Sequence, residues 1–162
     1  MNKNIFTLGF ALMTTLVVLT SCEEEEDYTS SPPLFSDVTF NDSIVYAGDT
    51  LIATAIQSRQ ARLVDRTTYS WTLSQGGETV DVEHHYTPIV VYTQSPQNPT
   101  DTLVIENPGN YVLTLEASYN ISGQSDGSTF STSIPDGNVS CSASIFRFMM
   151  TVTKRFIVKA KP

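Results

Sequence analysis

The sequence predicts an all-β domain built as a single antiparallel β-sandwich. Short runs rich in Val, Ile, Thr, Tyr and Phe recur from residue 34 to the C-terminus, and these residue types favour strands. Gly, Pro, Asn and Asp interrupt the runs, as expected for turns. No stretch of about ten or more residues carries the 3.6-residue apolar repeat of a helix. Many short strands without helices are typical of a sandwich.

The strands are expected to follow one another with short connections. The segments expected to form strands are residues 37–40, 43–46, 50–58, 67–74, 79–86, 88–93, 102–106, 111–119 and 145–160, the last as one long or two short strands. The connections include turns at 47–49, 75–78 and 107–110, a loop at 95–100 and a long polar loop at 120–138. Gly and Pro at the turns supply the backbone angles that such connections need.

Two segments alternate clearly between an apolar and a polar side, which is the pattern of a half-buried strand. Within 67–74 the apolar side carries Tyr69, Trp71 and Leu73. Within 111–119 it carries Tyr111, Leu113, Leu115 and Ala117. These residues are therefore predicted to line the core, with Trp71 between the two sheets.

Residues 1–21 have the pattern of an export leader. Lys3 precedes an apolar segment at 5–19, which is short for a membrane-spanning helix. The segment ends in L-T-S-C at residues 19–22, and this sequence resembles the lipobox of bacterial lipoproteins. The resemblance implies removal of residues 1–21 and acylation of Cys22. An ordinary signal peptide with a coincidental cysteine is the alternative.

Residues 22–33 are predicted to form a flexible tether between the lipidated cysteine and a domain spanning 34–162. The tether is acidic and then Ser/Pro-rich, and such a segment buries too little apolar surface to fold. Its acidic run consists of Glu23, Glu24, Glu25, Glu26 and Asp27. The run resembles the signal that directs lipoproteins of the Bacteroidota to the outer face of the outer membrane. A solvated spacer is the alternative, and the two roles are compatible.

Composition argues against nucleic acid as a partner and against a disulfide framework. The formal net charge is -8, with 9 Lys+Arg against 17 Asp+Glu, whereas a nucleic-acid surface needs clustered cations. Only two cysteines are present. With Cys22 acylated, Cys141 has no partner and is either a buried small hydrophobe or a reactive thiol. Its place among small residues before an apolar run favours burial.

Three segments share the pattern of a known domain: Y-S-W-T-L at 69–73, N-P-G-N-Y-V-L-T-L-E-A at 107–117 and T-V-T-K-R-F-I-V at 151–158. Together they resemble the PKD domain, an immunoglobulin-like β-sandwich of extracellular proteins. The resemblance covers about residues 37–160. The chain departs from the family where W-x-F-G-D-G is expected, since Trp71 is followed by T-L-S-Q-G-G. The resemblance implies a PKD-like, immunoglobulin-like fold.

No motif of a catalytic or metal site is recognised, so a non-enzymatic protein without cofactor or metal is predicted. His84 and His85 are adjacent, and neighbouring residues of a strand point to opposite faces, so one metal ion cannot easily bind both. Asp126-Gly127 and Asp136-Gly137 fit turns as well as fragments of a calcium loop. A hydrolase on an unfamiliar scaffold is a third alternative, for which no acid–base pair can be named.

Candidate binding and modification residues are of two kinds. Tyr86, Tyr92 and Tyr119 lie at predicted strand ends and are candidates for stacking a ligand, although strands favour tyrosine in any case. The tripeptides at 42–44, 49–51 and 101–103 read Asp, Ser or Thr, then an aliphatic residue. They resemble O-glycosylation sites of exported Bacteroidota proteins at Ser43, Thr50 and Thr102. The opening of a strand after a turn explains each one equally well.

The expected function is non-catalytic binding or scaffolding at the cell surface, held to the outer membrane by the lipid on Cys22. The resemblance to small surface lipoproteins implies an accessory subunit of a TonB-dependent, Sus-like importer that captures peptides or glycans. A free-standing glycan-binding or adhesion module is the alternative. The 120–138 loop is the expected contact region, since long loops are often functional.

Overall fold

The computed structural model describes residues 28–82, 89–91 and 98–162, and all regular structure in these ranges is β. None of these residues forms a helix that is long and apolar enough to cross a membrane. The leader, Cys22, the acidic run and the residues 83–88 and 92–97 lie outside the described ranges. The strands are β1 Thr29–Ser30, β2 Leu34–Phe40, β3 Val45–Tyr46, β4 Thr50–Arg59, β5 Val64–Gln75, β6 Glu78–Val80, β7 Ile89–Val91, β8 Thr100–Val104, β9 Gly109–Ile121, β10 Gln124–Ser125, β11 Phe130–Ile134, β12 Gly137–Ala143 and β13 Arg147–Lys159.

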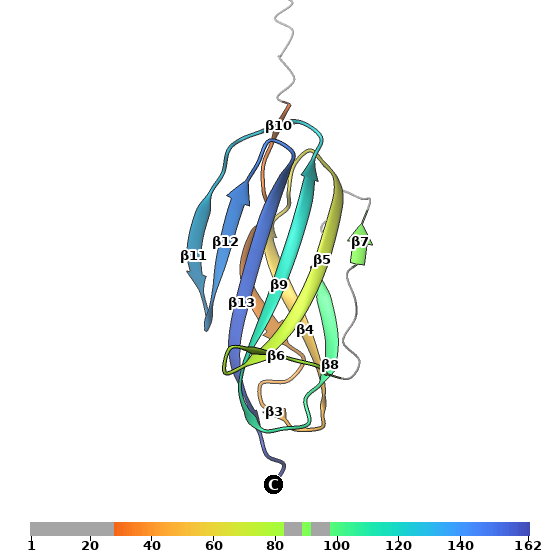
Figure 1. Cartoon of the computed structure of the whole chain (residues 1–162), viewed down its shortest axis with the longest axis vertical. Coiled ribbons are helices and arrows are strands. Elements are labelled where there is room, and N and C mark those ends of the chain that lie inside the picture. The colour runs from red at the N-terminus through yellow and green to blue at the C-terminus, as the bar shows by residue number, and fades with distance from the viewer. Residues whose placement is uncertain (1–27, 83–88, 92–97) are drawn as a thin grey trace, which may run out of the picture.

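Two sheets face each other, which confirms the predicted β-sandwich (Figure 1). The smaller sheet has the order β2-β4-β8, with all pairs antiparallel. The larger sheet has the order β11-β12-β13-β9-β5-β6, with β7 paired to β5 and β3 paired in parallel to β13. A short parallel pair, β1 with β10, closes one end.

The core is made by the inward side chains of both sheets, and the alternation predicted for β5 and β9 is confirmed. Trp71 is 5% exposed, and Leu113 and Leu115 are buried completely or almost so. They pack in one cluster with Val38, Leu51, Ala53, Ala55 and Leu103 of the smaller sheet and with Phe148, Met150 and Val152 of β13. Burying apolar area at about 25 cal/mol per Å² is the main source of stability, and Cys141, also buried, is one of these packed residues.

A buried ion pair joins the two sheets. Lys154 on β13 is 8% exposed, and its Nζ donates to Oδ1 of Asp37 on β2 at 2.7 Å and to the carbonyl of Pro135 at 3.0 Å. Lys154 occupies an inward position between Val152 and Phe156. Because a buried charge needs partners, this pair fixes how the two sheets are aligned.

Turns form where the sequence predicts them, and one carries an additional hydrogen bond. Gly76 and Gly77 connect β5 to β6 with φ of 62° and 91°, a conformation that glycine adopts without steric cost. At the start of β9 the hydroxyl of Tyr111 donates to the carbonyl of Asn107 at 2.8 Å. This bond ties the 107–110 turn to the strand that follows it.

Two predictions about the chain's organisation are wrong. The ordered domain begins before residue 34, because Ser30 is completely buried, Pro32 is almost so, and Thr29–Ser30 pairs with β10. The segment 120–138 is not one long loop, because it contains β10, β11 and the start of β12. Its Ser- and Thr-rich strands extend the larger sheet beyond β13.

Replacing Lys154 by Met should destabilise the fold, because it leaves the Asp37 carboxylate without its cation. Breaking a buried pair costs about 3–5 kcal/mol, and the Asp37 side chain is 30% exposed, which lowers the expected loss to about 2 kcal/mol. Urea unfolding of both variants measures this. The control Lys159→Met, exposed on the same strand, should change stability by less than about 0.5 kcal/mol. Equal effects of the two substitutions would contradict the role of the pair.

Candidate functional site

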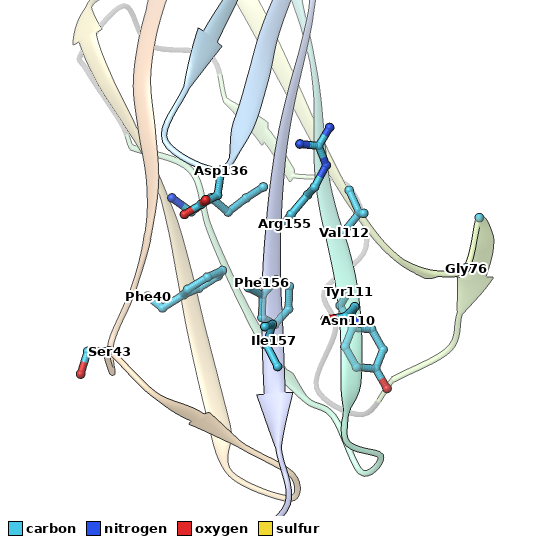
Figure 2. A pocket seen from close by; sticks show the side chains of 12 residues that line it. Phe40, Ser43, Gly76, Asn110, Tyr111, Val112, Asp136, Arg155, Phe156 and Ile157 are labelled. Atoms are coloured by element: carbon cyan, nitrogen blue, oxygen red, sulfur yellow. The ribbon is translucent and has the colours of Figure 1, made fainter.

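A groove of about 750 Å³ lies beside the C-terminal half of β13 (Figure 2). Arg155 and Ile157 come from β13 and Val112 from β9. The other lining residues, named here together, are Phe40, Ser43, Gly76, Gly77, Asn110, Tyr111, Asp136, Lys154 and Phe156. We refer to this space as the distal groove.

The groove lies at a gap between two strands, β12 and β3, that pair in turn with the same edge of β13. β12 pairs with β13 only as far as Lys154, and β3 begins to pair at Val158. Among the described residues, 155–157 therefore have no strand beside them on that edge. An open strand edge offers backbone donors and acceptors to a partner.

The β11–β12 turn sets the point at which pairing stops. Asp136 has φ of 52°, and its carbonyl accepts from the amide of Arg155 at 2.8 Å. Gly137 lies so close to β13 that an added Cβ would collide with the carbonyl of Thr153. Only glycine allows this close approach, so the turn is held directly against the upper end of the groove.

The lining combines an aromatic cluster with a few polar groups. The ring of Phe156 lies 4.8 Å from that of Phe40 and 6.0 Å from that of Tyr111, centroid to centroid. Ile157 is 61% exposed, and Arg155 and Asp136 are also exposed. On β13, Arg155 and Ile157 alternate with Phe156 and point to the opposite face of the strand. Apolar walls with a small number of polar groups are typical of ligand sites, and the volume is in their usual range of roughly 300–1,000 Å³.

Of the tyrosines predicted to stack a ligand, the structure describes only Tyr119, and for this residue the prediction is wrong. Tyr119 is 2% exposed and packs edge-on against Tyr69 at 6.1 Å. Burial, followed by the nearby Tyr69 hydroxyl, raises the pKa of Tyr119 far above its ordinary value. The ring fills the core because its strand position faces inward. Tyr86 and Tyr92 lie outside the described residues, as do His84 and His85.

Two of the three glycosylation-like positions lie on the outer face of the smaller sheet, whereas Ser43 lines the distal groove. Thr50 and Thr102 occupy outward positions on the neighbouring strands β4 and β8. Ser43 precedes β4 in a loop whose Asn41 side chain donates to the carbonyl of Thr50 at 3.2 Å. Ser43 and Thr50 are exposed, whereas Thr102 is half-buried and follows the buried Asp101. Modification of all three stays a prediction, with Ser43 and Thr50 the more accessible.

The remaining candidates for metal binding and thiol chemistry are Asp126 and Cys141, and both take part in local structure. Asp126 accepts from the amide of Ser128 at 2.8 Å, which is a turn interaction. No group of three or more His, Cys, Asp or Glu that could hold a metal ion occurs within the described ranges. The Cys141 thiol is buried, and burial, with a smaller contribution from Asp126, raises its pKa to about 11.

The distal groove is not predicted by the sequence. Its residues come from five separate stretches of the chain, so no local motif marks it. One signal was present: Ile157 is apolar at an outward position of β13, next to the outward Arg155. Met149 is a second exposed large apolar residue on the outward side of this strand.

Comparisons of the chain with protein-family models, with curated proteins and with solved structures find no match in any of the three.

Ionisation of the Cys141 thiol should lower the free energy of unfolding, and only in alkaline solution. The folded-state pKa of about 11 lies above the ordinary value of 9.0, so the folded state favours the protonated thiol. The stabilisation is complete below pH 9 and is lost as the pH rises through 11, with a loss on the order of 2 kcal/mol. Urea unfolding of wild type and Cys141→Ala between pH 7 and 11 isolates this effect, since Tyr119 is common to both. A stability difference that stays constant with pH would contradict it.

Proposed function

We propose that this protein is a non-catalytic lipoprotein of the outer-membrane surface that binds a ligand or protein partner through the distal groove. The observation that carries the proposal is the position of the groove relative to the N-terminus. The chain enters the domain at Tyr28, beside β10 (Figure 1). The groove opens near the other end of β13. Residues 147 and 155 of this strand are about 30 Å apart, at a rise of about 3.4 Å per residue. A domain anchored through its N-terminus would present the groove away from the membrane.

The anchor is Cys22, on the strength of the L-T-S-C sequence that ends the leader. Only six peptide units separate Cys22 from Tyr28, so an extended chain of this length reaches at most about 20 Å. Two or three acyl chains would hold such a protein stably at a bilayer. The acidic run at 23–27 would then direct the protein to the outer face.

The immunoglobulin-like, PKD-like assignment is part of the proposal and has three supports. The order β2-β4-β8 opposite β13-β9-β5 is that of a sandwich with Greek-key connections. A tyrosine near the start of a strand that bonds back to the preceding turn, as Tyr111 does to Asn107, is a hallmark of these domains. The third support is Trp71, buried between the sheets on β5.

The favoured role is an accessory subunit of a TonB-dependent, Sus-like importer that takes up peptides or glycans. An open strand edge, the Phe156 aromatic cluster and the Arg155 cation suit an extended chain with apolar and acidic groups. A free-standing glycan-binding or adhesion module is the second candidate. The half-buried rings of Phe40 and Phe156 favour it, because sugars stack on accessible aromatic rings.

Cys22→Ala should abolish membrane association. Wild-type protein from cells should carry acyl chains by intact mass and should sediment with outer membranes, whereas the variant should be recovered without lipid in soluble fractions. Whole-cell protease accessibility reports the side of the membrane. An unacylated wild-type protein would contradict the anchor, and a protease-protected one would contradict surface exposure.

The groove is tested by pull-down from detergent-solubilised outer membranes of the native cells. Arg155→Ala combined with Ile157→Ser should reduce recovery of the partner at least about tenfold, because central contacts dominate binding. The matched control is Ile52→Ser, which changes a side chain 41% exposed on the outer face of the other sheet. Recovery of wild-type protein alone would exclude the importer role, and equal losses in both variants would exclude the groove as the contact.

A further inference from the structure

We propose that the end of the domain nearest the N-terminus docks on the bilayer itself, with the side chains of Ile145 and Phe146 inserted among the lipid headgroups. This inference rests on the proposed anchor at Cys22 and adds a second, non-covalent contact with the membrane. We refer to Ile145 and Phe146 as the apolar tip. They form the β12–β13 turn and are 75% and 74% exposed.

The apolar tip is held in a fixed shape by its own backbone. The amide of Ser144 donates to the carbonyl of Arg147 at 2.9 Å, and the Ser144 hydroxyl oxygen accepts from the amides of Phe146 and Arg147 at 3.3 and 3.2 Å. The Phe146 carbonyl also accepts from the amide of Ile121 at 2.9 Å. Because the turn is ordered without the help of these two side chains, the fold presents them outward. Hairpin tips are usually polar, so two exposed large apolar residues here indicate a contact surface.

The apolar tip lies at the end where the N-terminal chain enters. Ile121, which bonds to Phe146, is three residues before Gln124, whose amide donates to the carbonyl of Tyr28 at 2.8 Å. Tyr28 is itself 65% exposed. With Cys22 acylated, the roughly 20 Å reach of the connecting chain keeps this end within that distance of the bilayer. Tyrosine and phenylalanine beside aliphatic residues are the side chains that favour a membrane–water interface.

Arginine side chains lie at this end of the domain, together with Asp65 and Asp126, although the whole chain carries a net charge of -8. Arg66 and Arg147 are the register partners of Asn120 on either side of β9. Arg59 ends β4 close by, and its guanidinium donates to the carbonyl of Pro32 at 3.2 Å. Cations beside an apolar tip add attraction to anionic headgroups. Because the acidic run lies between the anchor and this end in the sequence, the apolar tip contributes the larger part of the contact.

Tethering makes this contact effective although the tip is small. Two side chains alone give weak binding to a membrane, but a short tether raises their local concentration at the surface to the millimolar range. The tip would therefore orient a domain that the lipid already holds. When the apolar tip contacts the bilayer, the long strands stand roughly perpendicular to the membrane surface. The distal groove is then at the end of the domain that faces away from the membrane.

The test uses the acylated full-length mature protein in vesicles of phosphatidylethanolamine and phosphatidylglycerol, with or without brominated acyl chains. Phe146→Trp places a fluorophore at the tip, and Ile157→Trp places one at the distal groove as the matched control. Both positions are exposed, so the fold should be kept. Trp71 is buried and common to both variants. We expect the brominated lipid to quench the added F146W emission at least twofold and to leave the I157W emission unchanged.

Flotation of the same vesicles distinguishes this inference from the proposed anchor. Protein that floats without selective quenching of F146W overturns the docking contact and leaves the anchor in place. Protein that does not float overturns both. Cross-linking of Phe146 to a second protein in cells, with no quenching in vesicles, would replace the lipid by a protein partner and would likewise overturn the inference.

Discussion

The pairing of β9 with β13 is the interaction on which the rest of the structure depends. Twelve registered pairs join the strands, from Arg147 opposite Asn120 to Val158 opposite Gly109. The inward side chains of this ladder supply much of the core. The two candidate contact surfaces lie at the ends of this ladder. The apolar tip precedes β13, and the distal groove lies beside the last residues of β13. A ladder of this length keeps these two surfaces at opposite ends.

What distinguishes the two ends is the strand insertion between β9 and β13. β11 and β12 form a hairpin, and β12 pairs with β13 from Phe148 to Lys154. The edge of β13 is therefore covered over this stretch and open at residues 155–157. The same insertion produces the Ser144–Arg147 turn at the other end. The Lys154–Asp37 pair lies where the cover stops and ties the smaller sheet to this point. Anchoring and binding would thus be separate tasks of one connected strand arrangement.

The sequence predicted those parts of the fold that depend on local patterning. Alternation placed Trp71, Leu113 and Leu115 in the core, and glycine pairs placed the β5–β6 turn. It did not predict β1, because Ser30 is buried through distant partners: its hydroxyl donates to the carbonyl of Leu63 at 2.7 Å and accepts from the amide of Gly123 at 3.0 Å. Without knowledge of such distant hydrogen-bond partners, a polar segment is predicted to be a flexible tether. β11 was not predicted for the same reason. It is stabilised by hydrogen-bonded pairing with β12 and not by burial of its side chains.

Neutron reflectometry of the acylated protein on a supported bilayer tests the central claim, that the domain stands on the membrane by its N-terminal end. A domain in this orientation should give a protein layer about 45 Å thick, from the length of β13 at about 3.4 Å per residue, and the layer should be continuous with the headgroups. A water-filled gap between headgroups and protein, or a layer only as thick as one sandwich lying on its side, would contradict it.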